Sequence, residues 1–394
     1  MTAHTSDIEK ETLASGPPRK AIIGPVAANV AFVMELTLVP LLLPAIQLHF
    51  DLSISKLAWV FNSYGIAVAV GVLLGGWCGD AFSTRKVFGY GVAFFAAGSL
   101  IVAAADSFEM LIAGRILQGL GGGIFAPLVP LLLTRALPQK PGRALIVWGS
   151  ISGYLAAFAP LFYGSFLGGD GWKTAFIFIA IIAAIALLVL SGSPSSKDPA
   201  PYTGRPADYS ALFQARDLWM TFLYVFCTYG SITYYLFRLP VWLSENEVEA
   251  ASIGFVLSIM WLTFSCLSTL LRNMVDSPHL GAIMFAAPLL IVAGFPLLYL
   301  GDNFLLLIAS SVLVGSGLAC SNAPSTQLIL RFAPKGMSAV STSLDITFAR
   351  FGGIAAVALL AETEFAYAAV AMGLSCLAAA VCALAANKGL ADEG

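Results

Sequence analysis

Long apolar runs separated by short polar segments dominate the chain, and twelve of them are long enough to cross a membrane. A helix needs about 20 predominantly apolar residues to span the hydrocarbon core of a bilayer. The runs are continuous and do not alternate, which favours helices over the strands of a membrane barrel. The six runs of the first half cover residues 22–47, 57–79, 87–105, 109–134, 144–167 and 173–193. The six runs of the second half cover residues 218–243, 250–271, 280–300, 303–330, 337–360 and 365–386.

A polar segment, 194–217, separates the two sets of six runs. It is rich in proline, serine and charged residues, which is typical of a linker. The pattern therefore predicts an all-α membrane protein with one six-helix bundle at 22–193 and a second at 218–386. Residues 1–21 and 387–394 are expected to be tails. The first tail lacks an apolar region with a small-residue cleavage site, so the run after it is expected to be a spanning helix and not a signal peptide.

Composition agrees with a membrane protein and narrows the classes of partner. Of the 394 residues, 59% are hydrophobic and 11% are charged, whereas soluble domains carry about 25% charged residues. The net charge of −2 gives no basic surface for a nucleic acid. The six cysteines lie in or beside apolar runs without metal-ligand spacing, so we interpret them as small buried hydrophobes. The three histidines are too scattered for a metal or catalytic cluster.

Lysine and arginine are concentrated on one side of the predicted spans. Fifteen lie in the tails, the linker and the loops of one side, whereas only Lys56 and Lys173 lie on the other. The second side also contains the acidic loop SENEVE, residues 244–249. Because positive loops stay in the cytoplasm, both chain ends and the linker are predicted to be cytoplasmic, in a multi-pass protein of the inner (plasma) membrane.

The loop GWCGDAFSTRK, residues 76–86, brings charge close behind an apolar run. Asp80 is placed to meet a cation or the positive end of a helix, which would form a conformational latch. The alternative is that Arg85 and the lysine after it only anchor the loop in the cytoplasm. The loop resembles the signature loop of the major facilitator superfamily, matching it at Gly76, Asp80 and Arg85, although Ser83 and Thr84 differ from it. The resemblance implies a fold of two six-helix bundles, in which Asp80 contributes to contacts between the bundles.

Two charged residues lie inside predicted spans of the first half. RILQGLGGG, which begins at Arg115, resembles the R-x-x-q-G motif of the same superfamily, and this implies a role in proton-linked transport. Because an arginine is costly in a membrane, it is expected to face the bundle interior, where the alternative role is a structural tie to Gln118 or to a carbonyl. MELTLVPLLLPAI resembles a motif of the drug:proton antiporters, with Glu35 where that motif has aspartate. Desolvation makes such a carboxylate easier to protonate, so Glu35 is the first candidate for the proton site or for a cation contact.

Two further segments are similar to the drug:proton antiporters. SLDITFARFGGIAAVAL, residues 343–359, adds Asp345 as a coupling candidate; it lies five residues before Arg350, so each is expected to find partners on other helices. GYLAAFAPLFYG, residues 153–164, keeps part of a glycine motif associated with export, but Tyr163 replaces a glycine and is expected to hinder close packing. Twelve predicted spans also depart from the fourteen helices that are frequent in that branch.

Polar and aromatic residues inside the spans suggest the nature of the solute. Aromatic walls with a few hydrogen-bonding groups suit flat, largely uncharged organic molecules. The alternative is that most of the rings face lipid or the membrane interface. Arg238 either reaches the interface or meets an anionic group of the solute. The candidate cavity residues are Asn62, Gln118, Tyr154, Tyr229, Tyr235, Arg238, Asn322, Gln327 and Arg350.

These observations predict a secondary transporter of a small aromatic or amphipathic organic solute. Its two bundles would rock around a site near the midplane, with protons as the coupling ion. Efflux of drugs or metabolites is the leading direction, and uptake of a planar nutrient such as a riboflavin-like vitamin is the alternative. An enzyme is disfavoured because the sequence has no Walker lysine, metal-spaced His/Cys group or Ser-His-Asp candidate. A non-transporting sensor is the other class considered. We expect a monomer without cofactors.

Overall fold

The computed structural model describes residues 19–137, 141–164, 171–191, 210–271, 274, 279–299, 303–334 and 337–392. Within these residues the chain forms fourteen helices and no strand. The first half forms α2 (Arg19–Phe50), α3 (Ile54–Ala81), α4 (Thr84–Ala103), α5 (Phe108–Phe125), α6 (Leu128–Ala136), α7 (Pro141–Gly164) and α8 (Gly171–Ser191). The second half forms α9 (Ser210–Gln214), α10 (Arg216–Glu245), α11 (Ala250–Leu271), α12 (Leu280–Tyr299), α13 (Phe304–Phe332), α14 (Ser338–Leu360) and α15 (Phe365–Asp392).

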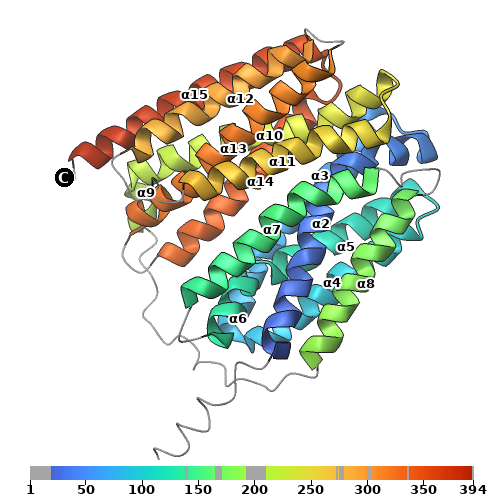
Figure 1. Cartoon of the computed structure of the whole chain (residues 1–394). Helices are drawn as coiled ribbons and strands as arrows, with labels where there is room; N and C mark the ends of the chain where they lie inside the picture. The colour runs from blue at the N-terminus through green and yellow to red at the C-terminus, as the bar shows by residue number, and fades with distance from the viewer. Residues whose placement is uncertain are drawn as a thin grey trace, which may run out of the picture.

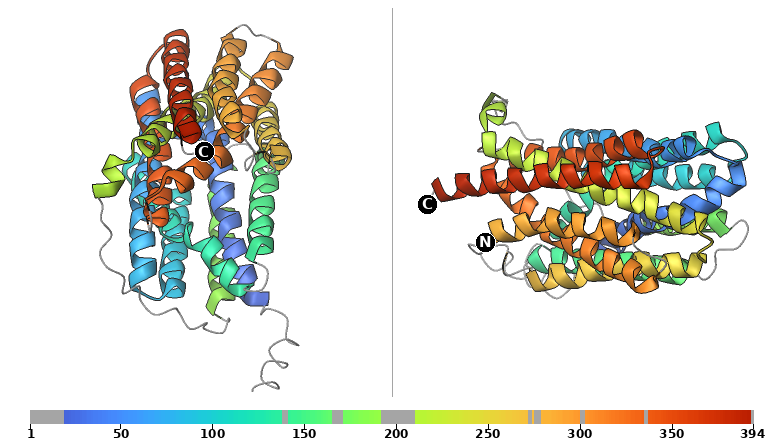
Figure 2. Two further views of the ribbon diagram at one scale, coloured as in Figure 1. Left: turned by 90° about the vertical axis from the view of Figure 1, so that its left-hand side faces the viewer. Right: turned by 90° about the horizontal axis from the view of Figure 1, so that it is seen from above.

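The long helices form two bundles that follow the two halves of the sequence. In Figure 1 the helices coloured blue to green, α2 to α8, lie in one bundle, and the helices coloured yellow to red, α10 to α15, lie in another beside it. The left view of Figure 2 shows the same division. The predicted all-α membrane architecture is therefore confirmed.

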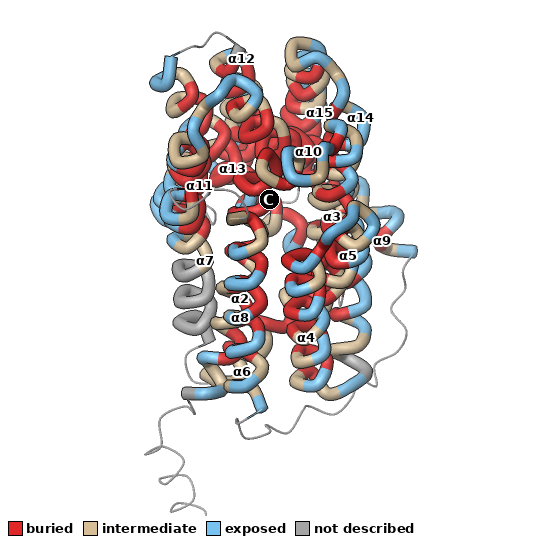
Figure 3. Tube along the Cα trace, turned by 90° about the vertical axis from the view of Figure 1, so that its right-hand side faces the viewer, coloured by how far each residue is buried: buried red, intermediate tan, exposed pale blue. Residues whose placement is uncertain are grey.

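Ten spans within the described residues are long and apolar enough to cross a bilayer, with α5 and α6 together forming one of them. The two other long helices, α7 and α10, lie alongside them in the bundles. Helix α10 is less apolar because it carries four tyrosines and Arg238. Figure 3 shows that buried residues concentrate where helices face one another, whereas outward faces are exposed. Large apolar side chains such as Phe162, Leu188 and Leu359 are more than 70% exposed, which a lipid environment favours and water does not.

The structure corrects three boundaries of the sequence prediction. The expected single helix 109–134 is interrupted at Ala126 and Pro127, because a proline has no N–H to continue the helical ladder. Helix α10 begins at Arg216, inside the expected linker. Helix α15 continues to Asp392, through most of the expected tail 387–394. Most of the linker and the first 18 residues lie outside the described residues.

Glycines bring helices of the first bundle into close contact. Gly71 and Gly75 of α3, four residues apart, face α5, where Gly119 and Gly123 repeat the same spacing. A Cβ added to Gly75 would lie 2.4 Å from the carbonyl oxygen of Ile124. Such small-residue spacing lets backbones approach closely in a membrane, where packing replaces the hydrophobic effect as the force between helices. The glycines of the RILQGLGGG motif therefore have a packing role.

The two bundles meet through small residues. On α7 and α11, Pro160 and Gly164 lie against Gly254, where an added Cβ would be 2.4 Å from the Pro160 carbonyl oxygen. The Tyr163 hydroxyl donates a hydrogen bond to the carbonyl of Gly171, at the start of α8, over 3.0 Å. The expectation that Tyr163 hinders packing is corrected: its ring points to α8, so α7 packs closely on α11.

The glycine contacts yield a test of the packing with a matched control. We expect Gly75→Ala to destabilise the protein by about 1–3 kcal/mol, because the added methyl group overpacks the α3–α5 contact. Gly76→Ala, in which the methyl group meets nothing within 4 Å, should leave stability unchanged or slightly higher. Thermal unfolding of the two purified variants in detergent measures the difference. Equal melting temperatures would contradict the packing role.

Candidate functional site

A buried ion pair lies in the first bundle, on the side that faces the second bundle. The Arg115 guanidinium of α5 donates to the Glu35 carboxylate of α2, with 2.7 Å between Nη1 and Oε1. Both side chains are 1% exposed. The sequence analysis placed Glu35 and Arg115 on different spans, and the structure brings them together.

Further hydrogen bonds hold the arginine through two of its nitrogens. Its Nη1 also donates to Gln118 Oε1 over 2.7 Å, and its Nε donates to the carbonyl of Val60 over 3.2 Å. Gln118 Nε2 then donates to Ser99 Oγ on α4 over 2.9 Å. This chain of polar contacts connects four helices, so Gln118 orients Arg115 from inside the bundle and does not line the cavity described below.

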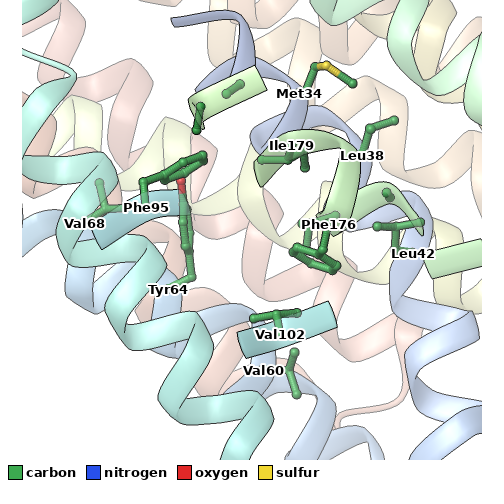
Figure 4. Packing of buried hydrophobic residues seen from close by; sticks show 14 of the residues in the cluster. Met34, Leu38, Leu42, Val60, Tyr64, Val68, Phe95, Val102, Phe176 and Ile179 are labelled. Atoms are coloured by element: carbon green, nitrogen blue, oxygen red, sulfur yellow. The ribbon is translucent and has the colours of Figure 1, made fainter. Parts of the chain in front are cut away.

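Aromatic rings cover part of the arginine of the pair. The Arg115 guanidinium lies 4.3 Å from the centroid of Tyr64 and 5.9 Å from that of Phe176. Such cation–π contacts strengthen as the cation loses water. Figure 4 shows Tyr64 and Phe176 in the apolar cluster of this bundle, with Leu38 nearby on α2. The aromatic cluster therefore forms the wall behind the pair.

A cavity opens between the bundles on the other side of Glu35. It has about 60 Å³ of space for water and is lined by residues of both halves. Helices α2, α3 and α5 contribute from the first bundle, and α10 and α14 from the second. The polar residues of its lining are Glu35, Asn62, Tyr64, Arg115, Thr233 and Arg350. The cavity has room for a few water molecules or for one polar group of a solute.

Several polar atoms at this cavity have no protein partner. Glu35 Oε2, the Tyr64 hydroxyl and Asn62 Oδ1 are buried and lack a hydrogen bond among the described residues. Asn62 Nδ2 donates to the carbonyl of Ile354 on α14 over 3.2 Å, which connects the two bundles. Buried polar groups are normally paired, so atoms left open at a cavity indicate a place for water or for a ligand.

Arg350 reaches the cavity from the middle of α14. It is partly buried, and no hydrogen bond or ion pair of its guanidinium exists within the described part of the chain. Asp345, the carboxylate five residues earlier, instead accepts a hydrogen bond from Thr326 Oγ1 over 3.1 Å and is 8% exposed. Asp345 therefore lies buried against α13, away from the Glu35–Arg115 pair.

The remaining cavity candidates occupy different places. The Tyr229 hydroxyl donates to Asn322 Oδ1 over 2.8 Å, which joins α10 to an exposed position on α13. Tyr235 is buried, and its hydroxyl lies 3.0 Å from Ser311 Oγ inside the second bundle. Arg238 pairs with Glu245 near the end of α10, with 2.9 Å between Nη1 and Oε2. None of these residues lines the cavity beside Glu35.

Two candidates on α7 and α13 also lie outside that cavity. Tyr154 is 50% exposed, on the same face of α7 as the exposed Phe158 and opposite to the contacts with α2 and α11. Gln327 is partly buried on α13. Tyr154 thus belongs with the aromatic residues that face outward, which was the alternative interpretation of the rings.

The expected conformational latch consists of Gly76, Asp80 and Arg85, and the structure describes the side-chain contacts of only some of them. Arg85 donates a hydrogen bond to the carbonyl of Leu190, at the end of α8, where a cation also complements the helix dipole. Arg135 donates to Thr84 Oγ1 over 2.9 Å, which holds the α3–α4 turn to the end of α6. Both contacts lie within the first bundle. Nothing lies within 4 Å of a Cβ added to Gly76, and the Asp80 side chain is outside the described residues.

The sequence analysis missed Thr233 and the role of Tyr64. Tyr64 was one aromatic residue among many, and only the fold places its ring on Arg115. Thr233 gave no signal, because a single threonine in an apolar helix is common. No group of three or more histidine, cysteine or acidic side chains suited to a metal occurs in the described ranges.

Two helix bundles with a cavity that both of them line are typical of membrane transporters. Comparison with known proteins identifies the family. A sequence profile of the Major Facilitator Superfamily matches residues 26–357, and the chain belongs to this superfamily of transporters, which are not enzymes.

Individual proteins resemble this chain over only about half of its length. The tetracenomycin C resistance and export protein of Streptomyces glaucescens is 30% identical over 175 residues, which are 44% of this chain and 32% of that protein. A multidrug resistance protein B homolog of Mycobacterium tuberculosis is 30% identical over 200 residues, which are 50% of this chain and 37% of that protein. Each alignment thus covers only about a third of the relative's length.

Solved structures share the fold at low identity. A D-xylose-proton symporter has a TM-score of 0.74 at 15% identity, covering 94% of this chain and 97% of its own. The nucleoside transporter NupG has a TM-score of 0.71 at 13% identity, covering 93% and 98%. These likenesses extend the fold assignment to nearly the whole chain.

Removal of one partner of the buried pair should be strongly destabilising. We expect Arg115→Ala to lower the free energy of unfolding by about 3–5 kcal/mol, because Glu35 is left without a cation. Thermal unfolding of the wild type and the variant in detergent measures the loss. Lys86→Ala, at an exposed position of α4, is the control, and an equal loss in the two variants would contradict the role of the pair.

Proposed function

We propose that the chain is a proton-coupled secondary transporter of a small amphipathic organic solute. The observation that supports this most directly is the buried Glu35–Arg115 pair, because it opens on the only cavity described here that residues of α2, α5, α10 and α14 line together. A carboxylate in this position changes its charge when it binds a proton. A change of charge at the interface of the two bundles alters which arrangement of the bundles is favoured.

In this mechanism Glu35 carries the coupling proton and Arg115 responds to it. Ionised Glu35 holds the Arg115 guanidinium, whereas protonated Glu35 releases it toward the cavity. In the ion-paired form, Gln118 accepts a hydrogen bond from the arginine and the Tyr64 ring covers its guanidinium. Asp345 is the second candidate for a proton, because it is a buried carboxylate whose only hydrogen bond in the described structure comes from a hydroxyl.

Efflux is the direction that the relatives support. The printed names of two of them describe resistance to, or export of, drug-like compounds. The close packing of α7 on α11 also removes the argument that Tyr163 raised against export. Uptake of a planar nutrient remains the second candidate. The unpaired Arg350 at the cavity favours it, because an anion that binds this arginine would enter together with a proton.

Proton movement in proteoliposomes tests the proposal. Liposomes that contain the protein and a trapped pH dye are exposed to riboflavin, puromycin and a panel of aromatic acids and amines. A transported solute should change the internal pH, and the sign of the change gives the direction of coupling. Glu35→Gln should abolish the pH change but retain solute exchange, because exchange needs no net proton transfer. Unchanged proton movement in Glu35→Gln would rule out Glu35 as the proton carrier.

We also propose that the protein lies in the inner (plasma) membrane as a monomer, with both termini in the cytoplasm. The excess of lysine and arginine on one side of the spans supports this orientation. A reporter that fluoresces only in the cytoplasm should be active when fused to either end. A reporter that is inactive at one end would show an odd number of spans and contradict the orientation.

A further inference from the structure

The cavity between the bundles has an unbalanced set of charged groups. Its lining contains one acidic side chain, Glu35, and two arginines, Arg115 and Arg350. Arg115 is neutralised by Glu35 at 2.7 Å. Arg350 has no hydrogen bond or ion pair in the described structure, although it lies near the middle of a spanning helix.

We infer that the transported solute is an organic anion, whose acidic group binds Arg350 in this cavity. The inference deepens the proposed function and depends on it. An unpaired guanidinium at bilayer depth is costly, and such residues normally face a cavity and mark the path of a substrate or an ion. A carboxylate or similar group supplies the missing counter-charge and matches the paired donors of arginine.

The neighbouring acidic residue does not serve as the partner of Arg350. Asp345 is five residues away, which places the two side chains about 140° apart around α14. Its carboxylate accepts a hydrogen bond from Thr326, and no oxygen of Asp345 lies within 4.0 Å of a nitrogen of Arg350. Tyr229 interacts electrostatically with both groups, but a phenol supplies no counter-charge near neutral pH.

The other open groups of the cavity complete a site for an acidic group. The Tyr64 hydroxyl lies beside the Glu35 carboxylate but forms no hydrogen bond of ordinary geometry in the described structure, and Tyr64 lines the same cavity as Arg350. Thr233 adds a second hydroxyl from α10. The volume of about 60 Å³ accommodates an acidic group but not a whole drug-sized molecule, which needs about 300 Å³ or more. The body of the solute therefore requires the bundles to separate.

An anionic solute fixes the sign of the coupling. A bound anion repels ionised Glu35 and competes with it for Arg115, so it favours the protonated form of Glu35. By reciprocity, a proton on Glu35 strengthens the binding of the anion. The groups that face Glu35 are Arg115, Tyr64 and Arg350, and no other titratable side chain lines this cavity among the described residues. Proton and solute therefore bind together and cross in the same direction, which is the uptake candidate.

Binding of matched probes tests the charge of the solute. A panel of aromatic carboxylates is compared with amides and amines of the same ring systems by thermal shift of the full-length protein in detergent. The carboxylates should raise the melting temperature most. Arg350→Gln should weaken their binding at least ~10-fold, with partial recovery in Arg350→Lys. Arg331→Gln, which removes an exposed arginine of α13, should bind them as the wild type does.

Three results would overturn the inference. They are preferential binding of the amines or amides, equal binding of the carboxylates to wild type and Arg350→Gln, and no binding by any member of the panel. A melting temperature of ligand-free Arg350→Gln at or above that of the wild type shows that the variant folds and that the arginine was unpaired. A lower value shows that Arg350 has a structural partner and counts against the inference.

The pH dependence of binding tests the coupling separately. The wild type should bind the carboxylates more tightly as the pH is lowered, within the range in which these probes stay ionised. In Glu35→Gln the affinity should be independent of pH, because Arg115 has no ionic partner at any pH. Carboxylate binding that depends on Arg350 but not on pH would leave the anion site intact and refute the joint binding of a proton. The proposed function has a different test: it is wrong if liposomes that contain Glu35→Gln move protons as the wild type does.

Discussion

The buried pair between Glu35 and Arg115 is the interaction on which the rest of the site depends. Two ionised groups that are 1% exposed need each other, because neither has water to solvate it. The pair also depends on its surroundings: Gln118 and Val60 accept from the arginine, and the Tyr64 ring covers it. In the proposed mechanism, a proton on Glu35 removes one of the two charges and so changes the electrostatic balance at the cavity between the bundles.

Glycine packing makes this arrangement possible. The close contacts at Gly75 and Gly123 bring α3 and α5 together, and this contact sets the distance between Tyr64 and Arg115. Small residues repeat this arrangement at Gly254, between the bundles. Small residues at this interface let the backbones of the two bundles lie in contact.

The unequal number of charges at the cavity connects this architecture to the choice of solute. Arg115 is neutralised within the first bundle, whereas Arg350 enters from the second bundle without a partner. A solute that supplies the missing charge therefore contacts both bundles at once. The sequence resemblance to drug:proton antiporters and the charge of this cavity favour opposite directions of coupling, and the charge of the solute decides between them.

The sequence by itself determined the class of fold, the order of the spans and the two residues of the central pair. Apolar length and the cost of a charge in lipid act locally, so Glu35 and Arg115 were recognisable as interior groups. Tertiary structure alone decided their partners. Gln118 and Tyr235 were expected at the cavity but point into bundle interiors, Tyr154 faces outward, and Arg238 pairs with Glu245. The physical reason is that the face of a fully apolar helix is set by its neighbours, which have no signature in its own sequence.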